Sequence, residues 1–241
     1  MAKSKQYFIR KAHRYLGVVL GIQFLFWTIG GLYFSWSNMD EVHGDLTKKS
    51  VPNFSADVRL ISPLVALDSI KSNFDIDSLI GFQLVEILGK PYYQIKCKKN
   101  NQLQNYLADA VDGKLRPALT EKEAIQVASS HYNGQATVES AVYITTTDAD
   151  HEYRENPLPA YAVSFKDKAQ TTVYVAAELG TVQKFRNAKW RTFDFLWMMH
   201  TMNYSDRDKF GNALLRSFSI LGLITIASGF WLFFITQKKR F

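Results

Sequence analysis

Two long stretches without a charged residue, one near each end of the chain, constrain most strongly how this sequence can fold. The first covers residues 15–36 (YLGVVLGIQFLFWTIGGLYFSW) and the second covers residues 217–236 (SFSILGLITIASGFWLFFIT). At about 1.5 Å per residue, a helix of about 20 residues is about 30 Å long, which matches the hydrocarbon core of a bilayer. The sequence therefore predicts two transmembrane helices.

The flanks of the two segments predict their orientation. Residues 1–14 carry five basic and no acidic side chains, and residues 237–241 carry three basic side chains. Because flanks rich in Lys and Arg stay in the cytoplasm, we expect both termini inside and residues 37–216 on the far side. The first segment is longer than the core of a signal peptide and no small-residue cleavage site follows it, so we expect an uncleaved anchor.

The charge balance and the single cysteine exclude several functions. The net charge of +7 owes much to the basic flanks of the apolar segments, so we expect no nucleic-acid partner. Cys97 cannot form an intramolecular disulfide, and without a C-x-x-C-H motif any haem would be noncovalent haem b. The G-x-G-x-x-G, P-loop, H-E-x-x-H and G-x-S-x-G motifs are all absent. We therefore assign no catalytic residue, and no metal beyond haem iron.

Between the apolar segments, the pattern changes to that of an α+β domain. After a linker at residues 37–61, Ser62 and Pro63 predict the start of a helix. Thr120 and Glu123 predict a second start, through a capping box. Each start is followed by three strand-like runs. The runs are FQLVEIL, PYYQIKCK and QNYLADAV after the first start, and SAVYITT, AYAVSF and TTVYVAAE after the second.

The two sets align as an internal repeat, residues 62–119 and residues 120–186. Pro91-Tyr92-Tyr93 aligns with Pro159-Ala160-Tyr161, and residues 106–113 align with residues 174–180, at offsets of 68 and 67 residues. The extra residues of the second copy fall mainly in the polar loop DADHEYRENPLP. We therefore predict a duplicated unit, in which one helix packs on a small antiparallel sheet.

Residues 187–216 join the second repeat to the second apolar segment and contain an aromatic block, which predicts an amphipathic helix on the external membrane surface that docks the external domain. An imidazole in such surroundings costs desolvation energy unless it is bonded or ligating, so His200 is a candidate functional residue. We expect residues 205–208 to form a solvated turn after it. The block consists of Trp190, Phe193, Phe195, Leu196 and Trp197.

Several of these motifs resemble those of one known family. The strand YLADAVDG at residues 106–113, with the closing turns GKLRP and GTVQKFRN, resembles the PepSY domain. HRYLG at residues 13–17 resembles the H-R-W-L-G motif of the PepSY-associated transmembrane family. LWMMHTMNY at residues 196–204, with GFWL at residues 229–232, resembles its L-H-T-G…S-G-x-W-L segment. The resemblance implies a short, two-helix member in the bacterial inner membrane, with its large domain in the periplasm.

The resemblance also implies a function. Longer members include inner-membrane reductases linked to siderophore iron, with intramembrane histidines as haem ligands. His13 and His200 occupy the positions that match the family's histidines. His43 is added on position alone, because it follows the first segment on the external side, where His200 is also expected. The chain would then be a haem-b electron-transfer component for periplasmic iron reduction, with quinol or a flavoprotein as donor. The alternative is a non-catalytic anchor or accessory subunit, in a homo-oligomer or with other inner-membrane subunits, whose repeats bind a protein partner.

Spacing limits how the three histidines could share a haem. His13 and His43 would be about 45 Å apart along a continuous helix, so they cannot ligate one iron. His43 and His200, both expected at the external face, could form a bis-histidine site. His13 could also be a polar interfacial anchor and His43 a solvated loop residue. The methionines that offer an axial thioether are Met198, Met199 and Met202.

Overall fold

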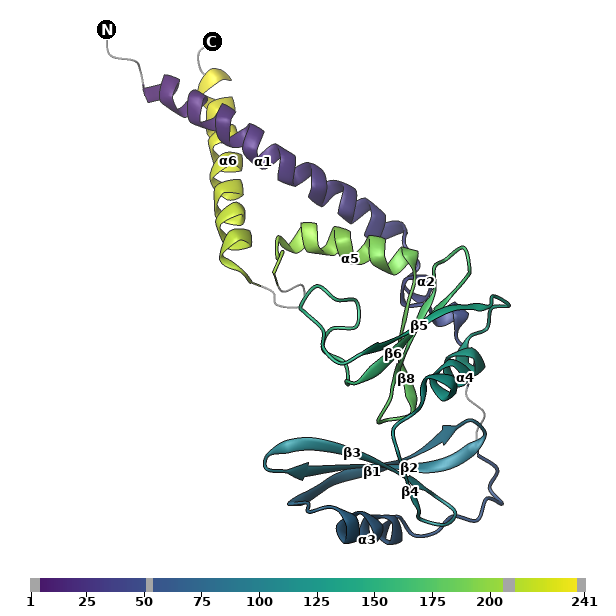
Figure 1. Ribbon diagram of the computed structural model, residues 1–241. Helices are drawn as coiled ribbons and strands as arrows, with labels where there is room; N and C mark the ends of the chain where they lie inside the picture. Colours follow the sequence, from purple (N-terminus) through teal and green to yellow (C-terminus); the bar gives the residue numbers. More distant parts are fainter. Residues whose placement is uncertain (1–4, 51–53, 206–210, 238–241) are drawn as a thin grey trace. The chain divides into compact units, whose positions relative to one another are not determined.

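The computed structural model describes residues 5–50, 54–205 and 211–237 (Figure 1). The chain divides into two compact units, which are described separately. The helical unit consists of Met1–Ser37 with Thr192–Phe241, and the sheet unit consists of Asn38–Arg191. Of the solvated turn expected at residues 205–208, all but the first residue lies outside the described part, as do the basic residues at positions 238–240.

The helical unit contains α1 (Lys5–Trp36), the C-terminal part of α5 (Ala188–Thr201) and α6 (Ala213–Gln237). Both α1 and α6 are long and apolar enough to cross a membrane. Each begins before its uncharged segment, α1 at Lys5 rather than residue 15 and α6 at Ala213 rather than residue 217. No Pro or Gly interrupts the basic flank before α1's apolar run, so the helix continues through it.

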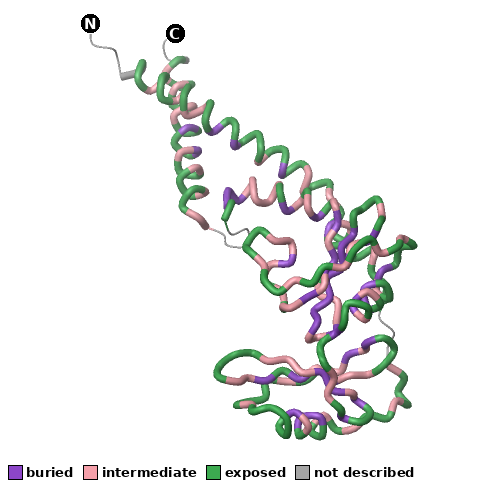
Figure 2. The backbone as a smooth tube through the Cα atoms, in the orientation of Figure 1, coloured by how far each residue is buried: buried purple, intermediate pink, exposed green. Residues whose placement is uncertain are grey.

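The two long helices are mostly exposed. Only 17% of the residues in the most apolar window of α1, and 11% of those in α6, are buried. Figure 2 shows the contrast with the strands, where buried residues are concentrated. The core helix of a soluble domain would bury its apolar side chains, so these helices need an apolar environment other than the described protein.

The sheet unit is α+β, with two four-stranded antiparallel sheets ordered β1-β2-β3-β4 and β5-β6-β7-β8. One helix precedes each sheet: α3 (Pro63–Asn73) the first and α4 (Glu121–His131) the second. A short helix α2 (Met39–His43) and a 3-10 helix η1 (Asp45–Thr47) begin the unit. The strands are β1 (Ser78–Ile87), β2 (Lys90–Lys99), β3 (Gln102–Asp109), β4 (Leu115–Arg116), β5 (Val138–Ile144), β6 (Ala160–Phe165), β7 (Thr172–Ala176) and β8 (Thr181–Arg186).

Both predicted helix starts carry the expected caps. The Ser62 side chain accepts a hydrogen bond from the Leu64 backbone N–H, and Pro63 is the first residue of α3. At α4, Thr120 and Glu123 form both bonds of a capping box. These bonds satisfy backbone donors that have no partner within the helix.

The strand registers of the two sheets agree with the internal repeat. Tyr93 pairs with Ala108 between β2 and β3, and Tyr161 pairs with Val175 between β6 and β7. These residues are related by the offsets of 68 and 67. The fourth strands differ from expectation: the segments GKLRP and GTVQKFRN, read as closing turns, contribute β4 and β8. Each pairs with the strand before it, so the closing segment completes the sheet.

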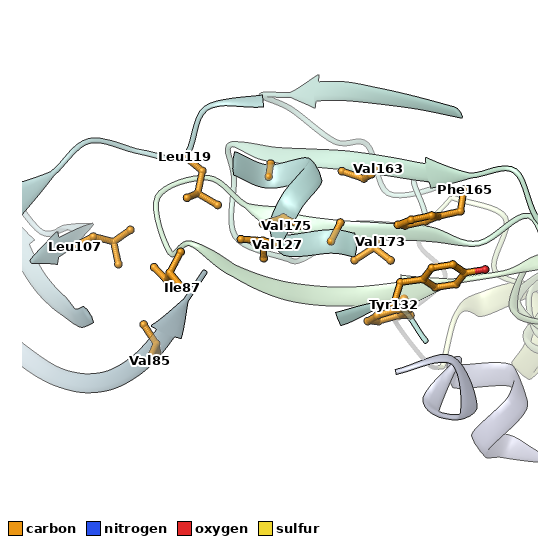
Figure 3. Close-up of a cluster of buried hydrophobic side chains, with 13 residues drawn as sticks. Val85, Ile87, Leu107, Leu119, Val127, Tyr132, Val163, Phe165, Val173 and Val175 are labelled. Carbon is orange, nitrogen blue, oxygen red and sulfur yellow. The ribbon is translucent and has the colours of Figure 1, made fainter. Parts of the chain in front are cut away.

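One hydrophobic core joins the two sheets within the sheet unit. Val85, Ile87 and Leu107 from the first sheet share a buried cluster with residues of α4 and the second sheet (Figure 3). A second cluster packs α3 on the other side of the first sheet, and it contains the buried Cys97. Cys97 is therefore a small buried hydrophobe, as its sequence context suggests.

Candidate functional site

The α1–α6 contact uses His13. Its Nδ1 lies 2.8 Å from the Ser228 hydroxyl oxygen. Because that hydroxyl also donates to the Thr225 carbonyl, at 2.8 Å, it accepts from His13, whose Nδ1 carries the proton. The imidazole packs against Gly229, where an added Cβ would come within 3.2 Å of His13 Cε1. His13 is thus an interhelical hydrogen-bond donor in a contact that a glycine makes possible.

Polar side chains of α1 form hydrogen bonds to the backbone of α5. The Gln23 side chain donates to the Met199 carbonyl at 2.9 Å, and the Trp27 indole donates to the His200 carbonyl at 2.8 Å. Further along α1, the Phe34 ring lies 4.8 Å from the Phe193 ring. The order of these contacts shows that α5 runs antiparallel to α1.

His200 lies in an aromatic environment. Its ring centroid is 6.0 Å from Trp27, 6.0 Å from Phe34 and 6.1 Å from Trp197. The interplanar angle with Trp197 is 9°, so the two rings are stacked. Its Nδ1 is buried and has no hydrogen-bond partner among the described residues. An unpaired ring nitrogen at this depth costs free energy, which keeps His200 a candidate ligand.

His43 is the last residue of α2, a one-turn helix. The alternative to a ligand role had placed it in a loop. The Asn38 side chain caps this helix by accepting from the Asp40 backbone N–H. The His43 side chain is exposed, and Gly44 ends the helix with φ of 74°. His43 belongs to the sheet unit and His200 to the helical unit, so their pairing stays a prediction.

The residues of the helical unit fit a haem only in part. His200 contacts Trp27 of α1, and His13 lies 14 residues before Trp27 on the same helix. At about 1.5 Å per residue, His13 and Trp27 are about 21 Å apart along α1. The two imidazoles therefore cannot bind one iron, and His13 uses one ring nitrogen for Ser228. Met202, buried and with φ of 52°, follows α5 close to His200 in sequence. The unit thus offers two histidines that each have a ring nitrogen without a hydrogen bond among the described residues, but they lie too far apart to share one iron.

A half-buried ionic network in the sheet unit was not predicted from the sequence. Glu152, in the loop that was expected to be polar and solvated, accepts from Arg191 at 2.7 and 2.9 Å and from the Tyr174 hydroxyl at 2.7 Å. Beside it, the Tyr153 ring is fully buried and stacks on Tyr174 at 4.6 Å. Burial raises the pKa of Glu152, but the bonds from Arg191 and Tyr174 outweigh it and lower that pKa overall. The network anchors the insertion of the second repeat.

A groove of about 610 Å³ lies on the face of the first sheet that α3 does not cover. Its floor comes from the first three strands, and its far wall comes from Pro157 and the β7–β8 turn. The floor mixes apolar and polar side chains, and Lys96 is the only charged residue among the described residues that line the groove. The polar lining residues are Gln83, Gln94, Lys96, Asn105, Thr181 and Gln183.

The structure so far defines an α+β protein with two apolar helices and two antiparallel sheets that share a core. Comparisons of the chain with protein-family models, with curated proteins and with solved structures give no match.

Proposed function

We propose that this chain is a membrane-anchored, non-catalytic accessory subunit of the bacterial inner membrane, and that its sheet unit binds a protein partner in the periplasm. In this proposal α1 and α6 span the bilayer, with both termini in the cytoplasm. The two helix-plus-sheet copies act as PepSY-type repeats.

The membrane assignment is supported by exposure and charge. The described residues leave the apolar surfaces of α1 and α6 uncovered, and a bilayer supplies the environment that these surfaces need. Basic residues flank both segments on the proposed cytoplasmic side. The PepSY-type assignment is supported by the order of elements, since a capped helix followed by four antiparallel strands occurs twice.

The binding role is carried by one observation: β1 forms an apolar edge that no described strand covers. It pairs with β2 on one side only. Sheet edges present unpaired backbone groups, and proteins usually protect them unless a partner adds a strand. By contrast, the polar side chains of His13, Gln23 and Trp27 are used in contacts within the helical unit, as expected of an anchor.

The test is co-purification from native membranes. The full chain, extracted in a mild detergent and analysed by native mass spectrometry, should appear in a stoichiometric complex with another membrane or periplasmic protein. A variant with Lys residues at Leu79 and Phe82 should lose that partner but stay inserted. A chain that is monomeric or only self-associated would contradict the proposal.

The unpaired Nδ1 of His200 favours a second candidate function, electron transfer through haem b. His200 would hold the iron, the second ligand would come from a methionine or from another chain, and the group would supply one-electron chemistry. A reduced-minus-oxidised visible spectrum tests this candidate. Haem bands that vanish in His200→Ala but survive in His43→Ala would favour it, and a wild-type chain without haem bands would exclude it.

A further inference from the structure

We infer that the β1 edge is a docking site for an extended protein segment that adds a strand to the first sheet. In the bound state, an Asp or Glu of that segment lies opposite Gly81 and pairs with Lys96. This inference rests on the proposed partner-binding function and names its site and its chemistry.

The edge is open and almost uncharged. In the ten residues of β1, Glu86 is the only charged residue. Its carboxylate accepts a hydrogen bond from the Gly89 backbone N–H inside the β1–β2 turn. It therefore places no charge along the unpaired edge of β1. Phe82 is 54% exposed. Natural edges are usually protected by outward charges, so a long apolar edge of this kind indicates a partner.

A bulge limits where the added strand can pair. The β1–β2 register shifts between Leu79 and Gly81, so Ile80 is the extra residue. From Gly81 to Ile87 the ladder is regular. A bulge bends its strand and interrupts pairing, so the added segment should pair with the regular part.

The strand register places Lys96 of β2 opposite Gly81 of β1, which has no side chain. Gly81 is the cross-strand partner of Lys96 on β2. A Cβ added at Gly81 would meet nothing within 4 Å, so the space above it is open. The Lys96 side chain is exposed, and its ammonium forms no ion pair or hydrogen bond with any described residue. Because neighbouring strands lie about 4.8 Å apart, its long side chain can reach across Gly81 to a strand added outside β1.

A groove begins at this edge and extends across the first sheet to β3. Gly81, Gln83 and Lys96 line it, together with Asn105 of β3. The side-chain oxygen of Asn105 is buried and accepts no hydrogen bond from the described residues. It therefore lacks an N–H or O–H donor, but β1 and β2 separate it from a strand added outside β1, so it is not part of this docking site. The volume of about 610 Å³ lies in the range of ligand sites.

A second copy that pairs through its own β1 edge does not supply the missing acid. In a twofold antiparallel ladder of two β1 strands, residues that face each other lie on the same face of the sheet. Gly81 would then face Gln83, Val85 or Ile87 of the copy, because strand side chains alternate. None of these is acidic, and Glu86 points to the opposite face. The chemistry therefore favours a different protein with an acidic extended segment.

The experiment uses the full chain in nanodiscs and phage-displayed random ten-residue peptides. We expect the selection to enrich sequences with β-branched residues around an Asp or Glu. The tightest peptide, labelled with fluorescein, should bind Lys96→Glu at least about tenfold more weakly than wild type. Changing the peptide's acid to Lys should restore binding to Lys96→Glu, which a general loss of folding cannot do.

The control is Lys122→Glu, an equal charge change at an exposed position on α4, which should leave the affinity unchanged. Gly81→Phe, which fills the open space above Gly81, should weaken binding as much as Lys96→Glu. The inference is overturned if no peptide is enriched, if the enriched peptides lack acids, or if the charge swap restores nothing. If the native partner still co-purifies with Gly81→Phe, the partner binds elsewhere, and the proposed function survives without this site.

Discussion

A polar side chain within an apolar helix is costly in a bilayer unless it bonds to a neighbour. His13 and Gln23 of α1 both do so, to Ser228 of α6 and to the Met199 carbonyl of α5. The sequence marks Gln23 as the strongly polar side chain of the first apolar segment and so predicts a hydrogen bond across a helix interface; the structure gives its acceptor, the Met199 carbonyl. Residue type therefore indicates that a polar group in an apolar helix needs a partner, but the packing decides which one.

Ser228→Ala tests the His13 contact. It removes the acceptor of the Nδ1 hydrogen bond, so the free energy of unfolding in micelles should fall by about 0.5–1.5 kcal/mol. Ser219→Ala is the matched control, because among the described residues the Ser219 hydroxyl bonds only to the Leu215 carbonyl of its own helix. Unfolding in SDS, followed by circular dichroism, measures both. Equal effects of the two changes would contradict an interhelical role.

Glu152→Gln tests the half-buried ionic network of Glu152, Arg191 and Tyr174. It removes the charge that accepts from Arg191 and Tyr174, so it should destabilise the chain at pH 7 by about 2 kcal/mol. Urea unfolding of the full chain in micelles, read by near-UV circular dichroism, measures this loss. Glu139→Gln, at an exposed position on β5, should change stability little.

The same variant predicts a change in pH dependence. The pKa of Glu152 is below its ordinary value of 4.5, because Arg191 and Tyr174 stabilise the carboxylate against the effect of burial. Its stabilising contribution is therefore present above pH 4.5 and is lost as the pH falls through the lowered pKa. Wild type should lose stability more steeply than Glu152→Gln below pH 4.5. If the stability of the two proteins fell equally with pH, the bonds from Arg191 and Tyr174 would not stabilise the charged form of Glu152.

At the scale of elements, the sequence predicted α3, α4 and six of the eight strands, but not α2, η1, β4 or β8. Ser62 and the Thr120–Glu123 box mark helix starts through bonds to near neighbours in sequence, so the sequence alone reveals them. β4, with only two residues, is a strand because Leu115 and Arg116 meet Ala108 and Leu107. Such a strand is defined by its partner, and no pattern of its own could predict it.

Gly180→Ala tests the turn that leads into β8. Gly180 has φ of 70°, and an added Cβ would lie 2.3 Å from the Ile87 Cδ1 atom of the first sheet. The left-handed backbone costs about 1 kcal/mol for alanine, and the clash in the shared core adds to it. We expect a total loss of about 2–4 kcal/mol in the free energy of unfolding by urea.

The control for this change is Gly89→Ala in the β1–β2 turn. Gly89 also has a positive φ, 80°, but an added Cβ there meets nothing within 4 Å. Only the backbone cost of about 1 kcal/mol should appear. If both variants lost the same stability, the Gly180–Ile87 contact would not be part of the core that joins the sheets.

At the scale of the whole molecule, the repeat was visible in the sequence but the shared core was not. The offsets of 68 and 67 residues predicted two similar units, and the registers agree with them. Nothing in either copy indicated that Val85, Ile87 and Leu107 would join the cluster around α4. Strand periodicity tells which side chains share a face, and the partner of that face depends on packing between distant segments.

The topology of the chain can be tested with single cysteines in intact cells. The native Cys97 is buried and burial raises the pKa of its thiol, so it should not react and can remain in place. A cysteine at the exposed Asp148 should react with a membrane-impermeant maleimide in spheroplasts. A cysteine at the exposed Arg10 should react only after permeabilisation, because basic flanks stay in the cytoplasm. Labelling at Arg10 in intact spheroplasts would show that the basic flank had crossed the membrane, and protection of both positions would place the sheet unit inside.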